Sequence, residues 1–402
     1  MAFELGAFRF RLRSSKKYLH VEDYRSGARR ALPKVAWTYL DGGADSLATL
    51  RANRRAFRCW ALRQRVLTGS PAARVRTTVA GVELDLPVLL APTGLTGLMH
   101  WHGELGAARA AERAGTRLVL STASTYSLEE IAAGTAQSHW FQLYAWRDRK
   151  FIEELIERAA KSGFSVLFVT VDVPVLGNRL GEVQTGMAIP PVITPANLLD
   201  GLSHPRWSYG LARHRRISMR NLAPGVGAKN SVRSVGRHSR LMRPDLSWED
   251  LSWLRSAWSG QLFVKGILDP DDADRAIDCG ADGIVVSNHG GRQLDDAPAA
   301  LEMLPAISAK VRHRTQVLFD GGIRSGADVI KAICLGANAC LIGRAFLYGL
   351  ATEGSSGVER VLKILRSEIE RTLLLMGCPS TAELSPDWVL RAPVALTGCG
   401  PC

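Results

Sequence analysis

The sequence predicts an α/β fold, a closed (β/α)8 TIM barrel, and three observations support this prediction. Eight short runs rich in Val, Leu, Ile or Phe follow one another between residues 87 and 344, amphipathic stretches separate them, and several of these stretches end in Gly. Strands that alternate with helices form parallel βαβ units, and eight such units close into a barrel. A doubly wound open sheet is the alternative, but eight well-separated units in one continuous chain favour the barrel.

Each part of the chain has a place in this prediction. Residues 1–60 are expected to form N-terminal helices that precede the barrel, and the barrel spans residues 61–380. Its strands are expected at 87–92, 117–122, 139–144, 166–172, 261–267, 283–289, 316–322 and 339–344, with helices at 103–115, 149–163, 269–280 and 325–336. Residues 173–246 form a long basic loop inserted after strand 4, far longer than an ordinary βα connection, and residues 381–402 form a C-terminal tail.

The composition is that of a folded protein with an excess of positive charge. The 402 residues include 51 Lys and Arg against 38 Asp and Glu, a net charge of +13, and the 46% of hydrophobic residues exclude wholesale disorder. The charge is compatible with nucleic acid, an anionic membrane surface, anionic small molecules or compositional bias. Because the sequence has no helix-turn-helix, zinc-finger, RRM or KH signature, we expect no nucleic-acid partner.

Three features bear on where the protein works. No apolar run reaches the roughly 18 residues of a membrane span, and the N-terminal MAFELGAFRFRLRSSKK lacks the apolar core of a secretory signal. The seven cysteines are scattered, which suggests reduced thiols, so we expect a cytoplasmic protein. The CGPC at 399–402 has the spacing of a redox motif, but that motif works at a helix N-terminus, so a flexible tail is expected instead.

Polar or reactive residues stand at the carboxyl end of every predicted strand. That end of a TIM barrel is the face on which its active sites are built. On a single strand such residues could simply mark where the apolar run stops, but eight strands with this chemistry indicate a site. The residues are Thr93, Ser121, Gln142, Tyr144, Thr170, Asp172, Lys265, His289, Asp320 and Arg344.

The segment SNHGGRQLD at 287–295 contains the sharpest pattern. His289 and Arg292 leave the end of strand 6 together, and the two glycines between them allow a tight backbone path. Such a His can accept a proton, and such an Arg can hold a carboxylate with two hydrogen bonds. A lone His is more often structural, but Asp172 at the end of strand 4 could orient this one and support its charge.

Two Gly and Arg groups follow the last two strands, in LFDGGIRSGADVIKAICLGANACLIGRAF. Loops after strands 7 and 8 are where many barrels bind phosphate through glycine N–H groups and Arg, although ordinary glycine turns would look similar. The residues are Gly321, Gly322, Arg324, Gly343 and Arg344. No nucleotide P-loop or GxGxxG fingerprint occurs in a suitable context, and no cluster has metal-ligand spacing, so no metal is expected.

Lys265 ends strand 5 inside the apolar run LFVKG, so its amine must meet an anion or change its pKa. Three interpretations stay open at this point. The amine could form a Schiff base as in aldolases, stabilise negative charge on a cofactor ring, or form a buried ion pair.

The motifs WFQLY, FVKG, SNHGGRQLD and DGGIRSGADV with IGRAF occur in this order, and together they resemble the FMN-dependent L-2-hydroxy acid oxidase/dehydrogenase family over roughly residues 20–390. That family includes glycolate oxidase, respiratory L-lactate dehydrogenase and (S)-mandelate dehydrogenase. The resemblance implies an FMN-binding (β/α)8 barrel that oxidises an (S)-2-hydroxy acid to the 2-keto acid. It further implies electron transfer to quinone and the respiratory chain, with an O2-reducing, peroxide-forming oxidase as the alternative.

The resemblance also implies a role for each matching position. His289 is the catalytic base, paired with Asp172, while Arg292, Arg179 and Tyr39 bind the substrate carboxylate. Two further residues act on the reacting groups: Tyr144 bonds the substrate hydroxyl, and Lys265 stabilises the reduced flavin. The implied FMN-binding residues are Pro92, Thr93, Gly94, Ser121, Gln142, Thr170, Lys265, Ser287, Asp320, Gly321, Gly322, Arg324, Gly343 and Arg344.

Departures from the family pattern concern the substrate. Gly94 stands where glycolate oxidase has Ala, and Ala123 stands where it has Trp, so the pocket near the substrate side chain is expected to be roomier. We therefore expect lactate, a longer aliphatic hydroxy acid or an aryl one such as mandelate, with a larger biosynthetic hydroxy acid as a further alternative.

The insertion could attach the protein to a membrane. Its segment 205–243 contains Trp207, Tyr209 and nine arginines, which could bind an anionic surface near the quinone, although a solvated basic loop is an equal alternative. The expected location is the cytoplasm, with peripheral attachment to the inner face of the cell membrane, and the resemblance implies a homotetramer. The nine are Arg206, Arg213, Arg215, Arg216, Arg220, Arg233, Arg237, Arg240 and Arg243.

Overall fold

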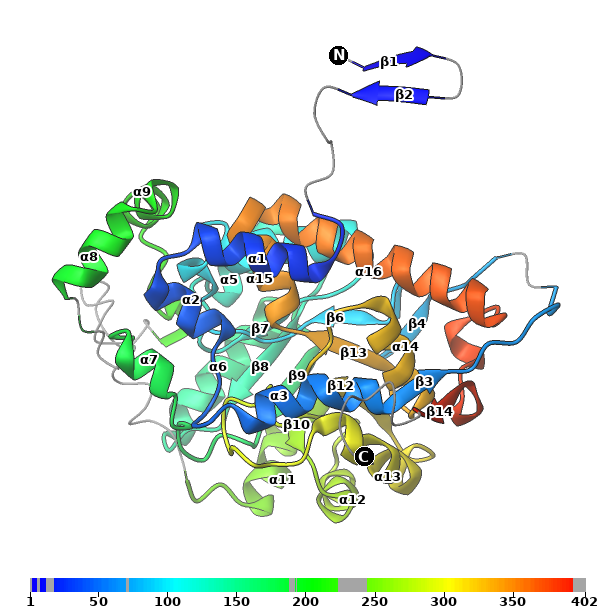
Figure 1. Ribbon diagram of the computed structural model, residues 1–402. Coiled ribbons are helices and arrows are strands. Elements are labelled where there is room, and N and C mark those ends of the chain that lie inside the picture. The colour runs from blue at the N-terminus through cyan, green and yellow to red at the C-terminus, as the bar shows by residue number, and fades with distance from the viewer. Residues whose placement is uncertain are drawn as a thin grey trace.

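The computed structural model describes residues 2–5, 8–11, 18–69, 72–187, 192, 194–222 and 244–392 (Figure 1). Within these ranges, eight parallel strands form one sheet in the order β6-β13-β12-β11-β10-β9-β8-β7. Leu90 of β6 pairs in parallel with Leu118 beside β7, and its N–H donates to the Arg117 carbonyl at 3.0 Å, so the sheet closes on itself. The predicted (β/α)8 barrel is confirmed.

All eight strands occur where the apolar runs predict them, trimmed by up to three residues at an end. Their bounds are β6 (Val88–Leu90), β7 (Val119–Ser121), β8 (Trp140–Tyr144), β9 (Val166–Thr170), β10 (Gln261–Ile267), β11 (Gly283–Val286), β12 (Gln316–Asp320) and β13 (Ala339–Ile342). The runs are continuously apolar because both faces of each strand are buried.

Successive side chains of each strand enter two different cores. Trp140, Phe168 and Phe263 point into the barrel, where Phe168 stacks on the other two rings with centroids 5.8 and 5.1 Å away. A hairpin of β4 (Thr77–Val79) and β5 (Val82–Leu84) covers the amino ends of the strands, and its Val79 and Leu84 complete this inner core. The carboxyl ends are thereby left as the open face of the barrel.

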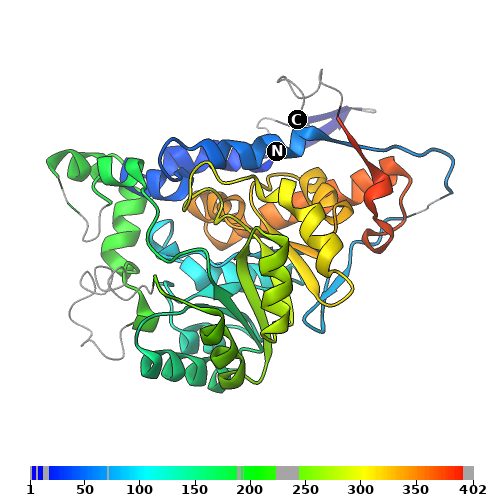
Figure 2. The same ribbon diagram turned by 90° about the horizontal axis from the view of Figure 1, so that it is seen from below.

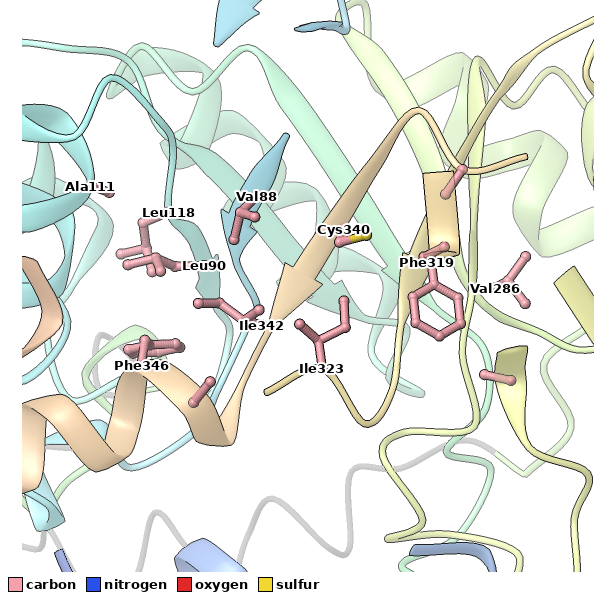
Figure 3. Close-up of a cluster of buried hydrophobic side chains, with 14 of the residues drawn as sticks. Val88, Leu90, Ala111, Leu118, Val286, Phe319, Ile323, Cys340, Ile342 and Phe346 are labelled. Atoms are coloured by element: carbon pink, nitrogen blue, oxygen red, sulfur yellow. The ribbon is translucent and has the colours of Figure 1, made fainter. Parts of the chain in front are cut away.

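The outer core lies between the strands and the surrounding helices. Figure 3 shows part of it, a cluster of buried side chains that includes Val88 and Leu90 of β6 together with Leu118 and Phe346. The helices of the barrel are α4 (Gly103–Arg113), α5 (Leu128–Gly134), α6 (Arg149–Lys161), α11 (Trp248–Ala257), α12 (Pro270–Asp278), α13 (Ala300–Val311), α14 (Gly326–Cys334), α15 (Arg344–Glu353) and α16 (Ser355–Met376).

The N-terminal segment packs on the barrel through α1 (Val21–Ala31), α2 (Lys34–Asp41) and α3 (Ala48–Arg55). Tyr24 of α1 donates to Glu353 at 3.0 Å, and the buried Asn53 of α3 exchanges amide hydrogen bonds with Asn288 beyond β11. After α3 the chain forms β3 (Trp60–Leu62), which pairs with β14 (Val389–Arg391). The division into segments at residues 60 and 380 stays a prediction.

The insertion after strand 4 contains helices, which the expected long basic loop did not include. They are α7 (Leu180–Gln184), α8 (Pro195–Leu202) and α9 (Pro205–His214). Proline is the first residue of both α8 and α9, a position that needs no N–H donor. Figures 1 and 2 show these helices at one side of the barrel, next to α2. Arg233, Arg237, Arg240 and Arg243 lie outside the described residues, as does the CGPC segment.

Two further findings concern the whole described chain. No helix within the described ranges is long and apolar enough to cross a membrane. Four cysteines there, Cys279, Cys334, Cys340 and Cys378, are free thiols as expected. Cys59 is disulfide-bonded, so the expectation of reduced thiols is wrong for that residue.

Candidate active site

A cavity opens at the carboxyl ends of the strands, and most of the predicted site residues line it. They come from six strand ends, from α2 and from the insertion, which are far apart in the sequence. The predicted residues along the cavity are Tyr39, Pro92, Thr93, Gly94, Tyr144, Arg179, Lys265, His289, Arg292, Asp320, Gly321, Gly322, Arg324, Gly343 and Arg344. Ser121, Gln142, Thr170 and Ser287 are buried at strand ends and do not line the cavity, and Asp172 lies behind His289.

His289 and Asp172 form a hydrogen-bonded pair, with 2.9 Å between His289 Nδ1 and Asp172 Oδ1. His289 has a φ of +57°, and its N–H is held by Ser287 Oγ at 3.1 Å, so the tight turn fixes its backbone in a conformation unusual for a non-glycine residue. Burial lowers the pKa of His289 against the opposing pull of the Asp172 carboxylate. The imidazole is therefore neutral near pH 7 and can accept a proton, and Asp172 supports the charge that results.

Lys265 lies at the centre of a buried polar network. Its Nζ donates to Ser287 Oγ at 3.0 Å and lies 3.1 Å from Asp320 Oδ2, while Ser287 itself donates to the same carboxylate oxygen at 3.0 Å. Burial works against the charged amine, but Asp320 and Asp172 outweigh it and raise the pKa of Lys265. A Schiff-base lysine needs a neutral amine, so this network argues against the aldolase interpretation.

Arg292 and Arg179 share one carboxylate, that of Glu182. Arg292 donates to Glu182 Oε1 at 2.7 Å and to the carbonyls of Tyr39 and Gly42 at 2.8 and 3.2 Å. Arg179 lies 3.9 Å from the other oxygen of Glu182. Two largely buried cations against one buried anion leave the pocket with an excess of positive charge, which suits an anionic ligand.

Small residues shape the cavity next to these arginines. Tyr39 donates its hydroxyl to the Gly94 carbonyl at 3.1 Å. A Cβ at Gly94 would lie 3.1 Å from the Ala123 Cβ and 3.4 Å from the Tyr39 hydroxyl, so an added methyl group would enter the cavity itself. Burial raises the pKa of Tyr144 and of Tyr39, which therefore carry neutral hydroxyl groups across the ordinary pH range.

The Gly and Arg groups after strands 7 and 8 meet on one side of the cavity. Arg344 donates to the Gly290 carbonyl at 3.0 Å and to the Gly42 carbonyl at 2.7 Å, while burial lowers its pKa to about 10. Gly322 has a φ of +84°, and a Cβ there would stand 2.3 Å from the Asn53 carbonyl, so only glycine fits. Arg324 completes the group and donates to Tyr348 at 3.3 Å.

The barrel, the His–Asp pair, the buried lysine and the paired Gly and Arg turns define a class of flavin-dependent oxidoreductase. The chain matches the FMN-dependent dehydrogenase family over residues 28–391, and it belongs to that family. It is 42% identical over 375 residues to a putative L-lactate dehydrogenase of Mycobacterium tuberculosis, covering 93% of this chain and 89% of that protein. It is 43% identical over 371 residues to an L-lactate dehydrogenase of Allorhizobium ampelinum, covering 92% and 98%.

Solved structures that superpose on this chain agree with the family assignment. The monotopic membrane protein (S)-mandelate dehydrogenase superposes with a TM-score of 0.90 at 40% identity, covering 94% of this chain and all of that one. A mandelate oxidase superposes with a TM-score of 0.77 at 36% identity, covering 90% and 96%. The expectation of an FMN-dependent enzyme is confirmed.

The residues present fit FMN. Gln142 Nε2 and Arg344 Nε are buried without a hydrogen-bond partner among the described residues. Gln142 Oε1 accepts a hydrogen bond from the Ser121 hydroxyl at 3.0 Å. The Nε2 amide of Gln142 is therefore left as a free donor beneath the cavity floor. Buried donors need an acceptor, and a flavin ring and a phosphate both supply one.

Sequence reasoning missed two sets of residues in this cavity. Glu182 stands three residues after Arg179, a spacing that places both on one helical face and could have indicated the pairing. The second set forms an apolar wall from the insertion and the segments beside it: Val173, Leu176, Met187 and Met219. Nothing in their sequence context marks them, because the folded path of the insertion alone brings them to the cavity.

Proposed function

We propose that the protein oxidises an (S)-2-hydroxy acid with an apolar side chain larger than that of glycolate, and that its electrons pass to a membrane quinone. The observation that carries this proposal is the placement of the His289–Asp172 pair beside Arg179 and Arg292, in a cavity whose wall on the side of the insertion is apolar. A base, two carboxylate-binding cations and an apolar side-chain pocket are what such a substrate requires.

In this proposal the protein binds and orients the substrate and moves its proton. Arg292 and Arg179 would bind the carboxylate and so hold the neighbouring carbon in one orientation for the reaction. His289 accepts the proton that the substrate loses, from the carbon or from the hydroxyl group, and Asp172 stabilises the imidazolium that forms. FMN, when bound, accepts the two electrons.

Other residues stabilise the products of this step. Lys265, kept charged by Asp320, offsets negative charge on the reduced cofactor. The neutral Tyr144 hydroxyl lines the same cavity and can hydrogen-bond the substrate oxygen as it becomes a carbonyl.

The proposed substrate class follows from the walls of the pocket. Gly94 and Ala123 leave space that Ala and Trp would fill, and Met187 and Met219 are flexible apolar side chains that can adapt to an aryl or long alkyl group. Anaerobic bleaching of the flavin with glycolate, L-lactate, (S)-mandelate and (S)-2-hydroxyoctanoate tests this. We expect the larger acids to react at least tenfold faster than glycolate. Glycolate as the best of the four would overturn the assignment.

For the electron acceptor, the support is an exposed apolar patch on the insertion. Leu198, Leu199 and Leu202 share one face of α8 and are 62%, 68% and 67% exposed, and Tyr209 of α9 is 69% exposed. Exposed apolar patches of this kind mark interaction surfaces. The related (S)-mandelate dehydrogenase is described as a monotopic membrane protein. We therefore propose that this α8 patch, consisting of Leu198, Leu199, Leu202 and Tyr209, dips into the inner face of the cell membrane.

The arginines and aromatic residues of the insertion divide into two groups. Arg206 and Arg213 are exposed and without an ion pair among the described residues, so they can face lipid phosphates. Arg216 pairs with Glu130 at 2.7 Å and stacks on the Tyr126 ring, and Trp207 donates to the Leu98 carbonyl at 2.7 Å. Arg216 and Trp207 are half-buried and bonded to the barrel, so they are not part of the proposed membrane surface.

Vesicle flotation tests the attachment. The wild-type protein should float with vesicles that contain phosphatidylglycerol. A variant in which all three leucines of the α8 patch become Ser should remain unbound at the bottom of the density gradient. Equal flotation of the two proteins would contradict the proposal. Far-UV circular dichroism of both proteins serves as the folding control.

An O2-reducing oxidase is the second candidate, because solved mandelate oxidases also superpose on this chain at 36% identity. Reoxidation of the substrate-reduced flavin in air, with measurement of peroxide, distinguishes the oxidase from the dehydrogenase. Slow reoxidation by O2 and fast reoxidation by a short-chain quinone supports the dehydrogenase. The homotetramer stays a prediction.

A further inference from the structure

A second cavity, of about 680 Å³, lies behind the active site, between α1, α9 and the segment that follows β6. We propose that it binds the ring of the quinone acceptor. This inference rests on the proposed function, since it assumes that a quinone takes the electrons. The wall of the cavity, the donors within it and its position beside the α8 patch support the assignment.

The two cavities share a thin wall. Leu95 lines the active-site cavity and Gly97 lines the second one. Only Thr96 lies between these two residues in the chain, so the Cα atoms of Leu95 and Gly97 are at most about 7.6 Å apart. A short separation of this kind is what electron transfer between a flavin and a second ring requires. Neither partner then has to enter the other's cavity.

The shared wall is rigid because a buried carboxylate holds it. Glu104 accepts from the Thr96 N–H at 3.1 Å and from the N–H and hydroxyl of Thr125 at 2.9 and 2.6 Å. Thr125 in turn accepts from the Gly97 N–H at 3.1 Å. A Cβ at Gly97 would stand 2.2 Å from the Arg216 carbonyl, so the close approach of this wall to the insertion requires glycine. The distance between the cavities is thereby fixed.

His100 supplies an unpaired hydrogen-bond donor in the second cavity. Its Nδ1 accepts from the His102 N–H at 3.1 Å, so the neutral ring carries its hydrogen on Nε2. No described residue bonds to that Nε2. Burial, together with the charges of His102 and His214, lowers the pKa of His100 to about 4, so the ring stays a neutral donor at physiological pH. A quinone carbonyl is an acceptor without charge, which matches such a donor.

Aromatic rings flank this donor. Trp101 follows His100 and stacks on His214 of α9 with centroids 4.1 Å apart and planes 12° from parallel. The indole of Trp207 also lines the cavity, held in place by its hydrogen bond to the Leu98 carbonyl. Flat aromatic walls and a neutral donor suit a planar quinone ring.

The second cavity lies next to the proposed membrane surface. Ser203 and Pro205 line it, and Leu202 of the α8 patch directly precedes them in the chain. Arg30 and Arg206 also line it, and neither forms an ion pair within the described ranges. An isoprenoid tail could therefore remain in the lipid while the ring occupies the cavity.

The electron and proton balance is simple. The hydroxy acid gives up two electrons and two protons as it becomes the keto acid. The quinone takes up two electrons from the reduced flavin and two protons from solvent at the cavity mouth, and it leaves as quinol. His100 donates a hydrogen bond and is not consumed.

The kinetic test separates the two half-reactions in the FMN-loaded enzyme. Ala31 lines the second cavity, and Ala31→Phe should fill it, while Ser26→Phe, on the exposed side of the same helix, is the matched control. In stopped flow with a ubiquinone that has a ten-carbon tail, we expect Ala31→Phe to slow flavin reoxidation at least tenfold. Flavin reduction by the hydroxy acid and reoxidation by ferricyanide should be unchanged, and Ser26→Phe should match the wild-type protein.

A second variant pair and a labelling readout complete the test. His100→Leu should raise the quinone KM about tenfold, whereas His100→Gln, which keeps a donor, should restore most of the affinity. An azido derivative of the same quinone should label residues 97–101 or 203–211 on illumination, and Ala31→Phe should abolish this labelling.

Four outcomes would overturn the inference. Normal quinone reactivity of Ala31→Phe, or labelling confined to residues 173–187 at the active-site cavity, would refute the second cavity alone. Labelling that phosphatidylglycerol displaces and quinone does not would assign the cavity to a lipid headgroup. A wild-type flavin that reacts with O2 but not with any quinone would instead refute the proposed acceptor, and the inference with it.

Discussion

The two walls of the active-site cavity are built in different ways. On the side of the strand ends, His289, Lys265 and Arg344 each have hydrogen-bond partners that hold them at fixed positions. On the side of the insertion, Met187 and Met219 contribute apolar surface only. The comparison indicates that the reaction depends on the rigid wall and substrate choice on the adaptable one, as expected when loops vary on a constant barrel.

The largest effect should come from the rigid wall. His289→Gln removes the base but keeps a side chain of similar size, so FMN should stay bound while flavin reduction by the hydroxy acid falls about 10²- to 10⁴-fold. Anaerobic stopped-flow absorbance measures both quantities in one sample. A normal reduction rate in this variant would mean that the His289–Asp172 pair is structural.

Asp172 should affect the same step less and change its pH dependence. Because the pKa of His289 is lowered from its usual value near 6.5, the wild-type reduction rate should be constant above that pH and fall only on further acidification. In Asp172→Asn the carboxylate that favours the imidazolium is lost, so the pKa of His289 drops further and the acid limb moves to lower pH. The plateau rate should fall about 10- to 100-fold. If the acid limb of the pH profile stays at the same pH in Asp172→Asn, the pairing of His289 with Asp172 is contradicted.

The difference between the walls also explains which residues the sequence could predict. The strand ends follow apolar runs at regular intervals, so Asp172, Lys265 and His289 could be placed at one face from spacing alone. Tyr39 required the family resemblance, since it lies on α2 before the barrel begins. Met219 was missed because it reaches the cavity only through the folded path of the insertion, and a long insertion has no periodic pattern that reveals its path. Glu182 was missed although its spacing from Arg179 could have indicated the pairing.

A change at Ala123, beside the substrate pocket just after β7, should alter substrate preference and leave the chemistry intact. Ala123→Phe fills the space next to Gly94, so reduction by (S)-mandelate should fall about 10- to 100-fold relative to reduction by L-lactate. The ratio of the two reduction rate constants is the measurement, and the unchanged flavin spectrum is the control. Equal losses for both acids would place the substrate side chain elsewhere.

Glu182 lies where the two walls meet, and its charge opposes that of the substrate. Glu182→Gln keeps an acceptor for Arg292 but removes the negative charge, so the dissociation constant of a carboxylate inhibitor such as oxalate should decrease about tenfold, or about 1.4 kcal/mol. Glu182→Ala is the control, because it also removes the acceptor that positions Arg292. Titration of the flavin absorbance with oxalate measures the dissociation constant for both variants. Weaker oxalate binding in Glu182→Gln would show that positioning outweighs charge.

The smallest expected effect concerns the outer surface of the insertion. Arg206 is exposed and has no ion pair among the described residues, so Arg206→Gln should weaken binding to anionic vesicles by about 1 kcal/mol, or about fivefold, and less as salt increases. Arg216→Gln is the matched control, because Arg216 already pairs with Glu130 and should change vesicle binding little. Sedimentation with phosphatidylglycerol vesicles at two salt concentrations measures the difference. If both variants bind equally, the charge of α9 is merely solvated, and the apolar α8 patch alone attaches the adaptable side of the molecule to the membrane.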